Sequence, residues 1–425
     1  MSCTRRQVLA RGAALASVAA LTPGAIRARR REPGRSLVVL QLTGGNDGLS
    51  TVVPWDEDGY GRARHETRLR QDDVLPLSGV GRRRLGLHAG LERLHRHYEE
   101  GRLAIVEGVG YPDMRRSHFA SLDVWHAADL RGRNVGEGWI GRLAAEAWPG
   151  EERPELVVHL GGRAPWSIHS ARRPPVAIHS PTAYRWFGPR PPTQLVEEIA
   201  CEEPAPADRD ASAGRKHGDP EHAGRDAALA RLRERVGDAR ESSRAVRSAA
   251  LAHRPRVAYP RDELGAVLRD VAGLVHGGLG TRVFSVSMTG FDTHSDQRGD
   301  HGTLMRVLDR GLGAFLADLA ESETGRATVV LAFSEFGRRV AENASAGTDH
   351  GKAGAAFLVA PPSPGGSGLR GGLFGAPPSL ARLDDGDLEP TTDFRSVYAA
   401  VIEGWFGVDA AAVLGGTFPP LPLFA

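Results

Sequence analysis

Residues 36–42, SLVVLQL, form a short and mostly apolar run that stops at the glycine-rich segment 43–48, TGGNDG. Such a run predicts a strand buried on both faces, which is typical of a parallel sheet covered by helices. Further runs of this kind lie at 103–106, 282–288 and 328–333, and helical spacing of apolar residues lies between them at 91–100, 117–128, 264–275 and 304–319. We therefore expect an α/β fold with a mostly parallel sheet sandwiched by helices.

The N-terminus has the pattern of an export signal. Arg5 and Arg6 precede a small apolar stretch at 13–21, which is too short to span a bilayer and is followed by small residues. This order resembles a twin-arginine signal, so we expect residues 1–28 to be a signal peptide, the twin-arginine export machinery to be a partner, and the mature protein to be periplasmic or extracellular. Cleavage would leave Cys201 as the single cysteine, which excludes an internal disulfide and a thiolate metal site.

The region 202–256 differs from the rest in composition. It is rich in Ala, Arg, Asp, Glu and Gly and poor in large apolar residues, so we expect an insertion whose first part is a mobile loop and whose later part, 227–251, forms an exposed helix. The remaining chain, 36–425, is expected to form a single domain around this insertion. The net charge of +2, with no compact basic patch outside the N-terminus, argues against nucleic acid as a partner, and no mature segment is apolar enough to span a membrane.

Side chains that bind metal ions follow the predicted strands. They are Asp47 after the first strand, Asp292 and His294 after 282–288, Glu335 after 328–333, and Asp349 with His350 a dozen residues later. The carboxyl ends of parallel strands meet at one edge of a sheet, so these groups are expected to converge there. Carboxylate oxygens and imidazole nitrogens without thiolate suit one or two divalent ions, with Zn, Mn, Mg and Ca not distinguished by the sequence.

Several motifs give a more specific indication. In chain order they are 42–54 (LTGGNDGLSTVVP), 108–112 (GVGYP), 116–119 (RSHF), 290–294 (GFDTH), 334–338 (SEFGR) and 347–351 (GTDHG). They resemble the signature blocks of a secreted bacterial family known as domain of unknown function 1501, over the chain from about residue 36 to its end. That family is grouped with the alkaline-phosphatase-like superfamily, which includes sulfatases and phosphodiesterases. The resemblance implies an alkaline-phosphatase-like fold and a metal site, with no established substrate.

The superfamily pattern implies that Asp47 is a metal ligand and that Asp292 with His294 holds one metal ion. The spacing between Asp292 and His294 is tighter than the superfamily usually has.

The later ligands match the pattern in two registers. In the first, Asp349 and His350 match the superfamily's Asp-His pair, but no histidine follows as its last ligand. In the second, Glu335 belongs to that pair and His350 is the last ligand. We prefer the second, which puts Phe336 where the superfamily usually has histidine and leaves one of two metal sites incomplete or altered.

The resemblance also indicates a nucleophile and substrate contacts. Superfamily members place a serine, threonine or modified cysteine at the start of the helix that follows the second strand, and Ser117 occupies that place, where it is equally well explained as a plain helix N-cap. His118 is a candidate catalytic or phosphate-contacting group, and its alternative is a surface histidine. The residues expected to bind substrate are Asn46, Arg116, Arg338 and Lys352.

Two classes of function follow from these predictions. The first is an exported metal-dependent hydrolase of phosphate or sulfate esters, acting on a small-molecule or glycan ester through metal-activated attack by Ser117. The second is a non-catalytic relative that keeps the fold and binds a metal ion or a glycan, for which Phe336 is the main support.

Overall fold

The structure is a computed structural model that describes residues 34–131, 136–151, 153–184 and 220–425. The predicted signal peptide and the first part of the predicted insertion lie outside the described residues. The chain divides into two compact units, one formed by Met1–Glu32 and Arg185–Arg244 and the other by Pro33–Tyr184 and Ala245–Ala425. The described part of the first unit is the N-terminal portion of one long helix, α8 (Pro220–Ala252).

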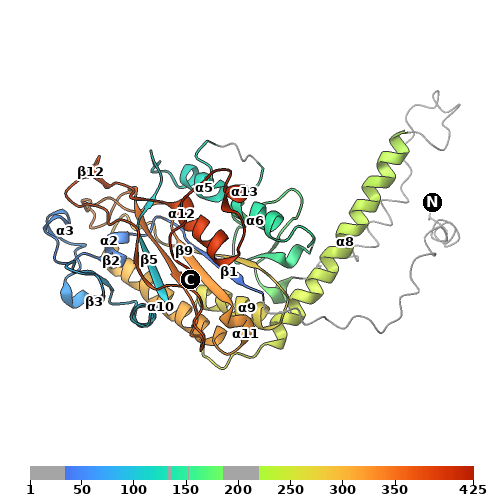
Figure 1. The fold of residues 1–425 in the computed structure, drawn as a ribbon, viewed down its shortest axis with the longest axis horizontal. Helices are drawn as coiled ribbons and strands as arrows, with labels where there is room; N and C mark the ends of the chain where they lie inside the picture. The colour runs from blue at the N-terminus through green and yellow to red at the C-terminus, as the bar shows by residue number, and fades with distance from the viewer. Residues whose placement is uncertain (1–33, 132–135, 152, 185–219) are drawn as a thin grey trace. The chain divides into compact units, whose positions relative to one another are not determined.

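The second unit is built around a nine-stranded sheet (Figure 1). Its strands, in spatial order, are β11 (Gly372–Phe374), β5 (Leu103–Gly110), β10 (Gly354–Val359), β9 (Thr328–Phe333), β1 (Ser36–Leu42), β8 (Val283–Met288), β6 (Val157–Leu160) and β7 (Val176–Ile178), with β14 (Thr392–Asp393) pairing β5. β10 is antiparallel to both of its neighbours, and every other pairing in this sheet is parallel. The mostly parallel sheet is thus confirmed.

Helices cover both faces of this sheet because its strands are apolar on both faces. In β1, Val38, Leu40 and Leu42 belong to one core, whereas Leu37 and Val39 belong to the other. The first core is completed by α4 (Glu92–Glu99), α9 (Glu263–His276) and α10 (Gln297–Leu319), and the second by α5 (His118–Ala127), α6 (Trp139–Ala147), α12 (Phe394–Ala399) and α13 (Ala410–Leu414). Figure 1 shows α9 and α10 on one side of β1 and β9, and α6 and α12 on the other.

Smaller elements surround this core. They are the helices α2 (Gly48–Thr51), α3 (Asp58–Ala63) and α11 (Glu323–Arg326), a π-helix at Ala400–Trp405, a small sheet of β2 (Val52–Val53), β4 (Gly86–His88) and β3 (Val74–Pro76), and a two-stranded pair of β12 (Leu383–Asp384) and β13 (Asp387–Leu388). Among the described residues, no helix is both long and apolar enough to cross a membrane.

The strand neighbours differ from those expected from chain order. The predicted strands at 36–42 and 103–106 follow one another in the chain, but β1 pairs with β8 and β9, and β5 pairs with β10, β11 and β14. The antiparallel strand β10 and the strand β6 were not among the predicted strands. Because β10 runs against its neighbours, its N-terminal end lies at the edge of the sheet where β9 ends.

Candidate metal and active site

Six of the predicted site residues come together at the carboxyl edge of the sheet. They are His118, Asp292, His294, Glu335, Asp349 and His350, from the N-terminus of α5, the segments after β8 and β9, and the segment before β10. The parallel strands β8 and β9 end at this edge, whereas β10 begins there because it is antiparallel. The edge of the sheet therefore gathers side chains that are up to 232 positions apart in the chain, from His118 to His350.

The centre of this group is the carboxylate of Asp292. Its Oδ1 lies 3.0 Å from Nε2 of His350 and 3.1 Å from Nε2 of His294, and its Oδ2 lies 3.5 Å from Nε2 of His118. The two nitrogens Nε2 of His294 and His350 are 3.0 Å apart. One ligand atom from each of His118, Asp292 and His350 lies within 4.8 Å of the others. We call His118, Asp292, His294 and His350 the edge cluster.

Each histidine of the edge cluster is held through its other ring nitrogen. Nδ1 of His118 lies 2.8 Å from Oε1 of Glu335, and Nδ1 of His294 lies 3.2 Å from Oδ1 of Asp349. Nδ1 of His350 lies 3.0 Å from the backbone carbonyl oxygen of Arg116. A carboxylate and a carbonyl oxygen only accept hydrogen bonds, so each Nδ1 carries a proton and donates.

This assignment of the protons to Nδ1 determines whether each Nε2 atom carries a proton or a lone pair. A neutral imidazole protonated at Nδ1 has a lone pair at Nε2, so His294 and His350 direct two lone pairs at each other and at a carboxylate oxygen. Such an arrangement needs a cation, which is either an added proton or a metal ion. A carboxylate or carbonyl behind each imidazole is the usual support of metal-bound histidine, so the residues fit a divalent metal with nitrogen and oxygen ligands.

The surroundings of Asp292 in the edge cluster favour its ionised form. Partial burial alone raises the pKa of Asp292, but the contact with His350 and the hydrogen bond from Arg338 outweigh it and lower the pKa to about 2. The hydrogen bond to Glu335 raises the pKa of His118. Asp292 and His294 keep 48% and 43% of their side chains exposed, so the edge cluster is open to solvent on one side, as a catalytic metal site requires.

The glycine turn after β1 packs directly against the edge cluster. Gly44 has φ +122° and Gly45 has φ +83°, and a Cβ on Gly45 would lie 2.3 Å from the ring of Phe336. The Phe336 ring contacts the rings of His118 and His350, with centroids 4.9 and 4.7 Å apart. The backbone N–H of Gly44 donates to Glu335, at 2.9 Å. The two glycines thus allow the close approach that fixes Phe336 and Glu335.

Glu335 supports His118 in this structure. Its side chain is 0% exposed and its Oε1 accepts from Gly44 and His118. Asp349 likewise accepts from Asn343 and His294, and the hydrogen bond from Asn343 lowers its pKa. Both carboxylates were predicted as metal ligands, and both stand behind a histidine of the edge cluster.

Asp47 occupies a different environment from the one predicted for it. Its carboxylate is 1% exposed and forms a buried two-bond ion pair with the guanidinium of Arg64. It also accepts from Gln297 at 2.6 Å and from Ser50 at 2.6 Å. Burial raises the pKa of Asp47, but Arg64 outweighs it and lowers the pKa to about 2. Because a guanidinium already binds both carboxylate oxygens, Asp47 is not available as a metal ligand in this arrangement.

The predicted catalytic serine is exposed beside the edge cluster. Ser117 stands at the N-cap position of α5, directly before His118, but its side chain makes no capping hydrogen bond. Ser117 therefore has the position of an N-cap residue, but its hydroxyl does not cap the helix.

The four predicted substrate-binding residues are all engaged with the protein. Asn46 is buried and bonds Thr51 and His301, and Arg338 is 0% exposed and donates to Asp292 and to the carbonyls of 44, 45, 291 and 348. Arg116 pairs with Asp385 and Asp387, and Lys352 pairs with Asp384. Asn46 and Arg338 thus build the site from inside, which corrects the expectation that they contact substrate, because neither side chain reaches the surface.

Sequence reasoning missed three residues that position the site. Gln297 at the start of α10 donates to Asp47, and its Oε1 accepts from Thr293 at 3.1 Å. Asn343 bonds both Asp349 and the carbonyl of His294. Arg64 pairs Asp47, but in a chain with so many arginines no local pattern distinguishes it.

An apolar groove of about 580 Å³ lies along the same edge of the sheet. It is lined by the carboxyl ends of β1 and β8, by α5, by the start of α9, by α10 and by the segment around Trp166. Phe119, two residues after Ser117, is 82% exposed and lines it, and Trp166 is 43% exposed.

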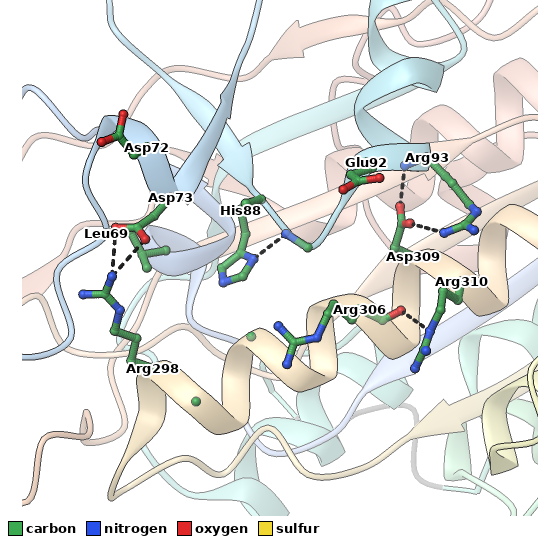
Figure 2. A pocket seen from close by; sticks show the side chains of 14 residues that line it. Leu69, Asp72, Asp73, His88, Glu92, Arg93, Arg298, Arg306, Asp309 and Arg310 are labelled. Carbon is green, nitrogen blue, oxygen red and sulfur yellow. Dashed lines mark hydrogen bonds and ion pairs between the residues drawn. The ribbon is translucent and has the colours of Figure 1, made fainter.

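A second pocket, of about 490 Å³, lies between α10 and the segments around Asp73 and His88 (Figure 2). None of the predicted site residues lines it. Its charged groups largely bind one another, since Arg298 bonds Asp73 and Arg93 bonds Asp309.

The fold and the site define an α/β protein with a histidine and aspartate cluster at the carboxyl edge of its sheet. Residues 213–414 match the model of a family described as Protein of unknown function (DUF1501), which confirms the resemblance that the motifs indicated. The matched range contains Asp292, His294 and His350 of the edge cluster. No curated protein matches the chain in a sequence comparison.

Solved structures similar to this chain include sulfatases. The crystal structure of Ps i-CgsB in complex with k-i-k-neocarrahexaose has 11% identity and a TM-score of 0.38, and a 2-O GAG sulfatase has 9% and 0.33. A putative sulfatase from Bacteroides thetaiotaomicron VPI-5482 has 9% and 0.26. Each match covers 90% of this chain and 75% of the other. The TM-scores lie below 0.5, so the fold class rests on the strand order and directions described above.

Proposed function

We propose that this protein is an exported, divalent-metal-dependent hydrolase of phosphate or sulfate esters. The observation that carries the proposal is the edge cluster, in which three histidines held through Nδ1 direct Nε2 toward the carboxylate of Asp292. Imidazole and carboxylate ligands that are open to solvent on one side are typical of catalytic metal sites.

The residues that would hold the ion are His118, Asp292 and His350, with His294 beside them. When bound, a divalent cation supplies Lewis-acid stabilisation of charge on the ester oxygens. Glu335 and Asp349 would fix the ring orientations of His118 and His294 and increase their basicity. Asp47 would stay outside the ligand set, since Arg64 binds its carboxylate.

Ser117 is the nucleophile in this proposal. Ser117 is an exposed residue directly before His118, and its side chain does not make the capping hydrogen bond that an N-cap serine usually makes. Its Oγ would form a bond to the phosphorus or sulfur atom while the ester bond breaks, and the alcohol would leave with the serine proton. Water would then hydrolyse the serine ester and release phosphate or sulfate, which restores the serine.

The groove beside α5 supports a glycan ester as the substrate. Exposed aromatic rings such as those of Phe119 and Trp166 offer flat apolar surfaces on which a sugar ring can stack, and the groove volume of about 580 Å³ suits an oligosaccharide. Phe119, which lines the groove, follows Ser117 and His118 directly in the sequence, although neither of those two residues lines it. The twin-arginine pattern supports delivery of the folded protein to the periplasm or beyond.

The test is hydrolysis of fluorogenic sulfate and phosphate esters by the purified protein, supplied in turn with Zn²⁺, Mn²⁺, Mg²⁺ and Ca²⁺. We expect turnover that is lost with a chelator and in Asp292→Asn, but kept in Asp58→Asn, whose carboxylate is 91% exposed on α3. Ser117→Ala separates the serine mechanism from direct attack by water. Activity that survives both Asp292→Asn and the chelator would exclude the proposal.

The second candidate is a non-catalytic protein that binds a metal ion and a glycan. The groove supports this candidate as well as it supports the hydrolase, because a sugar can stack on the exposed rings of Phe119 and Trp166 without being hydrolysed. It predicts binding to immobilised sulfated or phosphorylated glycans with no release of sulfate or phosphate. Hydrolysis that Ser117→Ala abolishes would refute it.

A further inference from the structure

A second histidine and aspartate group lies away from the carboxyl edge of the sheet. His253 follows the end of α8, His276 is the last residue of α9, and Asp318 is in the last turn of α10. One ligand atom from each lies within 4.8 Å of the other two. All three belong to the unit formed by Pro33–Tyr184 and Ala245–Ala425.

The carboxylate of Asp318 is shared by these side chains. Its side chain is 1% exposed, and Nε2 of His253 lies 2.9 Å from Oδ2 and 3.1 Å from Oδ1. Nε2 of His276 lies 3.6 Å from Oδ1. Tyr259 donates its hydroxyl proton to Oδ2, at 2.8 Å. Oδ1 therefore faces both imidazoles while Oδ2 is also held by Tyr259.

His276 has a buried nitrogen that the protein does not satisfy. Its side chain is only 10% exposed, its Nε2 is buried with no hydrogen-bond partner, and the distance of 3.6 Å to Asp318 is too long for a hydrogen bond. The ring stacks on that of His253, with centroids 4.3 Å apart and planes at 17°. A buried, unpaired ring nitrogen costs free energy unless a ligand engages it.

The surrounding charges favour a cation. The C-terminal ends of α8, α9 and α10 meet here, and the C-terminal end of a helix carries the negative end of its dipole. Among the described ion pairs, Asp318 has histidine partners alone, with no lysine or arginine. Burial, followed by the neighbouring His253, lowers the pKa of His276.

We propose that His253, His276 and Asp318 form a second divalent-cation site, with the two-nitrogen, one-oxygen ligand set that suits Zn²⁺. The site joins the ends of three helices, so its ion ties the C-terminal end of α8 to α9 and α10. This role is structural and does not depend on the proposed hydrolase activity.

The test uses the full chain with the edge cluster disabled by Asp292→Asn and His350→Gln. In this background we expect one Co²⁺ or Zn²⁺ per chain, measured by titration with Co²⁺ absorption and by elemental analysis, and a higher melting temperature with Zn²⁺. Adding His276→Gln should weaken binding by about tenfold or more and remove the shift in melting temperature. His97→Gln, which changes another buried histidine, on α4, should leave both unchanged.

Far-UV circular dichroism shows whether each variant folds, and His253→Gln replaces His276→Gln if that variant does not. Absence of a bound ion in the folded background variant would overturn the proposal. So would Co²⁺ or Zn²⁺ binding of unchanged affinity in a folded His276→Gln or His253→Gln variant.

Discussion

The Nε2 atoms of His294 and His350 lie 3.0 Å apart while the Nδ1 atom of each ring faces a hydrogen-bond acceptor. Two neutral imidazoles in this arrangement repel each other through their lone pairs, and Oδ1 of Asp292 adds negative charge 3.1 and 3.0 Å away. A cation between these atoms removes the repulsion. The pairing of these two histidines is thus the part of the site that most directly indicates a bound cation.

Glu335→Gln tests the support behind His118. The amide keeps the size of the side chain but removes the charge that orients the ring and raises the pKa of His118. We expect metal affinity to fall by about 10- to 100-fold, as is usual when such a support is changed. Competition with a chromophoric chelator measures it, and Glu57→Gln, at an exposed position before α3, is the control. Equal affinity of the parent and Glu335→Gln would contradict this role.

Gly45→Ala tests the close packing of the turn after β1 against Phe336. The new Cβ would lie 2.3 Å from the Phe336 ring at a backbone φ of +83°, so both a clash and backbone strain oppose it. We expect the free energy of unfolding to fall by about 2–4 kcal/mol in urea denaturation. Gly150→Ala, where nothing lies within 4 Å of the added atom, should change it by less than about 0.5 kcal/mol. Equal effects at both positions would rule out this explanation.

The Asp47–Arg64 ion pair predicts a specific dependence of stability on pH. The pKa of Asp47 is about 2 in the folded protein, against 3.8 for an unperturbed aspartate. A carboxyl group whose pKa is lower in the folded than in the unfolded protein stabilises the fold at pH values above its unfolded pKa. This stabilisation is lost as the pH falls through the folded pKa, and for Asp47 it amounts to about 2 kcal/mol in total. The difference in unfolding free energy between the parent and Asp47→Asn should therefore shrink by about 1.5 kcal/mol between pH 6 and pH 2.5. A constant difference would contradict the assigned pKa.

Phe119→Ala tests the groove. The ring is 82% exposed, so its loss should leave the free energy of unfolding within about 0.5 kcal/mol of the parent. If the groove holds a glycan, the dissociation constant for a sulfated oligosaccharide should rise several-fold in isothermal titration. Leu383→Ala removes another exposed apolar side chain, outside the groove, and should not alter binding. A binding constant that is the same in Phe119→Ala and the parent would exclude this use of the groove.

The strands that could be predicted from the sequence are those with a dense apolar pattern. The runs at 36–42, 282–288 and 328–333 become β1, β8 and β9, the three adjacent parallel strands at the centre of the sheet. The order of the strands could not be predicted, because pairing β1 with β9 joins segments almost 300 residues apart. No local pattern specifies which segments pair over that distance.

The candidate site was predictable to a similar extent. The rule that parallel strands end at one edge is enough to bring Asp292 and Glu335 together. His350 reaches the same edge for another reason, the reversed direction of β10, which was not predicted. The pairing of Asp47 with Arg64 depends on a buried contact across 17 residues, and a sequence of this composition gives no means of choosing one arginine.

Elemental analysis of the protein purified without chelator shows whether the edge cluster binds a metal ion. The parent is compared with Asp292→Asn/His350→Gln, which removes the centre of the edge cluster, and with Asp58→Asn/His97→Gln as the matched control. We expect the double variant to hold one divalent ion fewer per chain than the parent, and the control to hold the same number as the parent. An equal metal content in all three proteins, including after incubation with Zn²⁺, Mn²⁺, Mg²⁺ or Ca²⁺, would show that the edge cluster binds no metal ion.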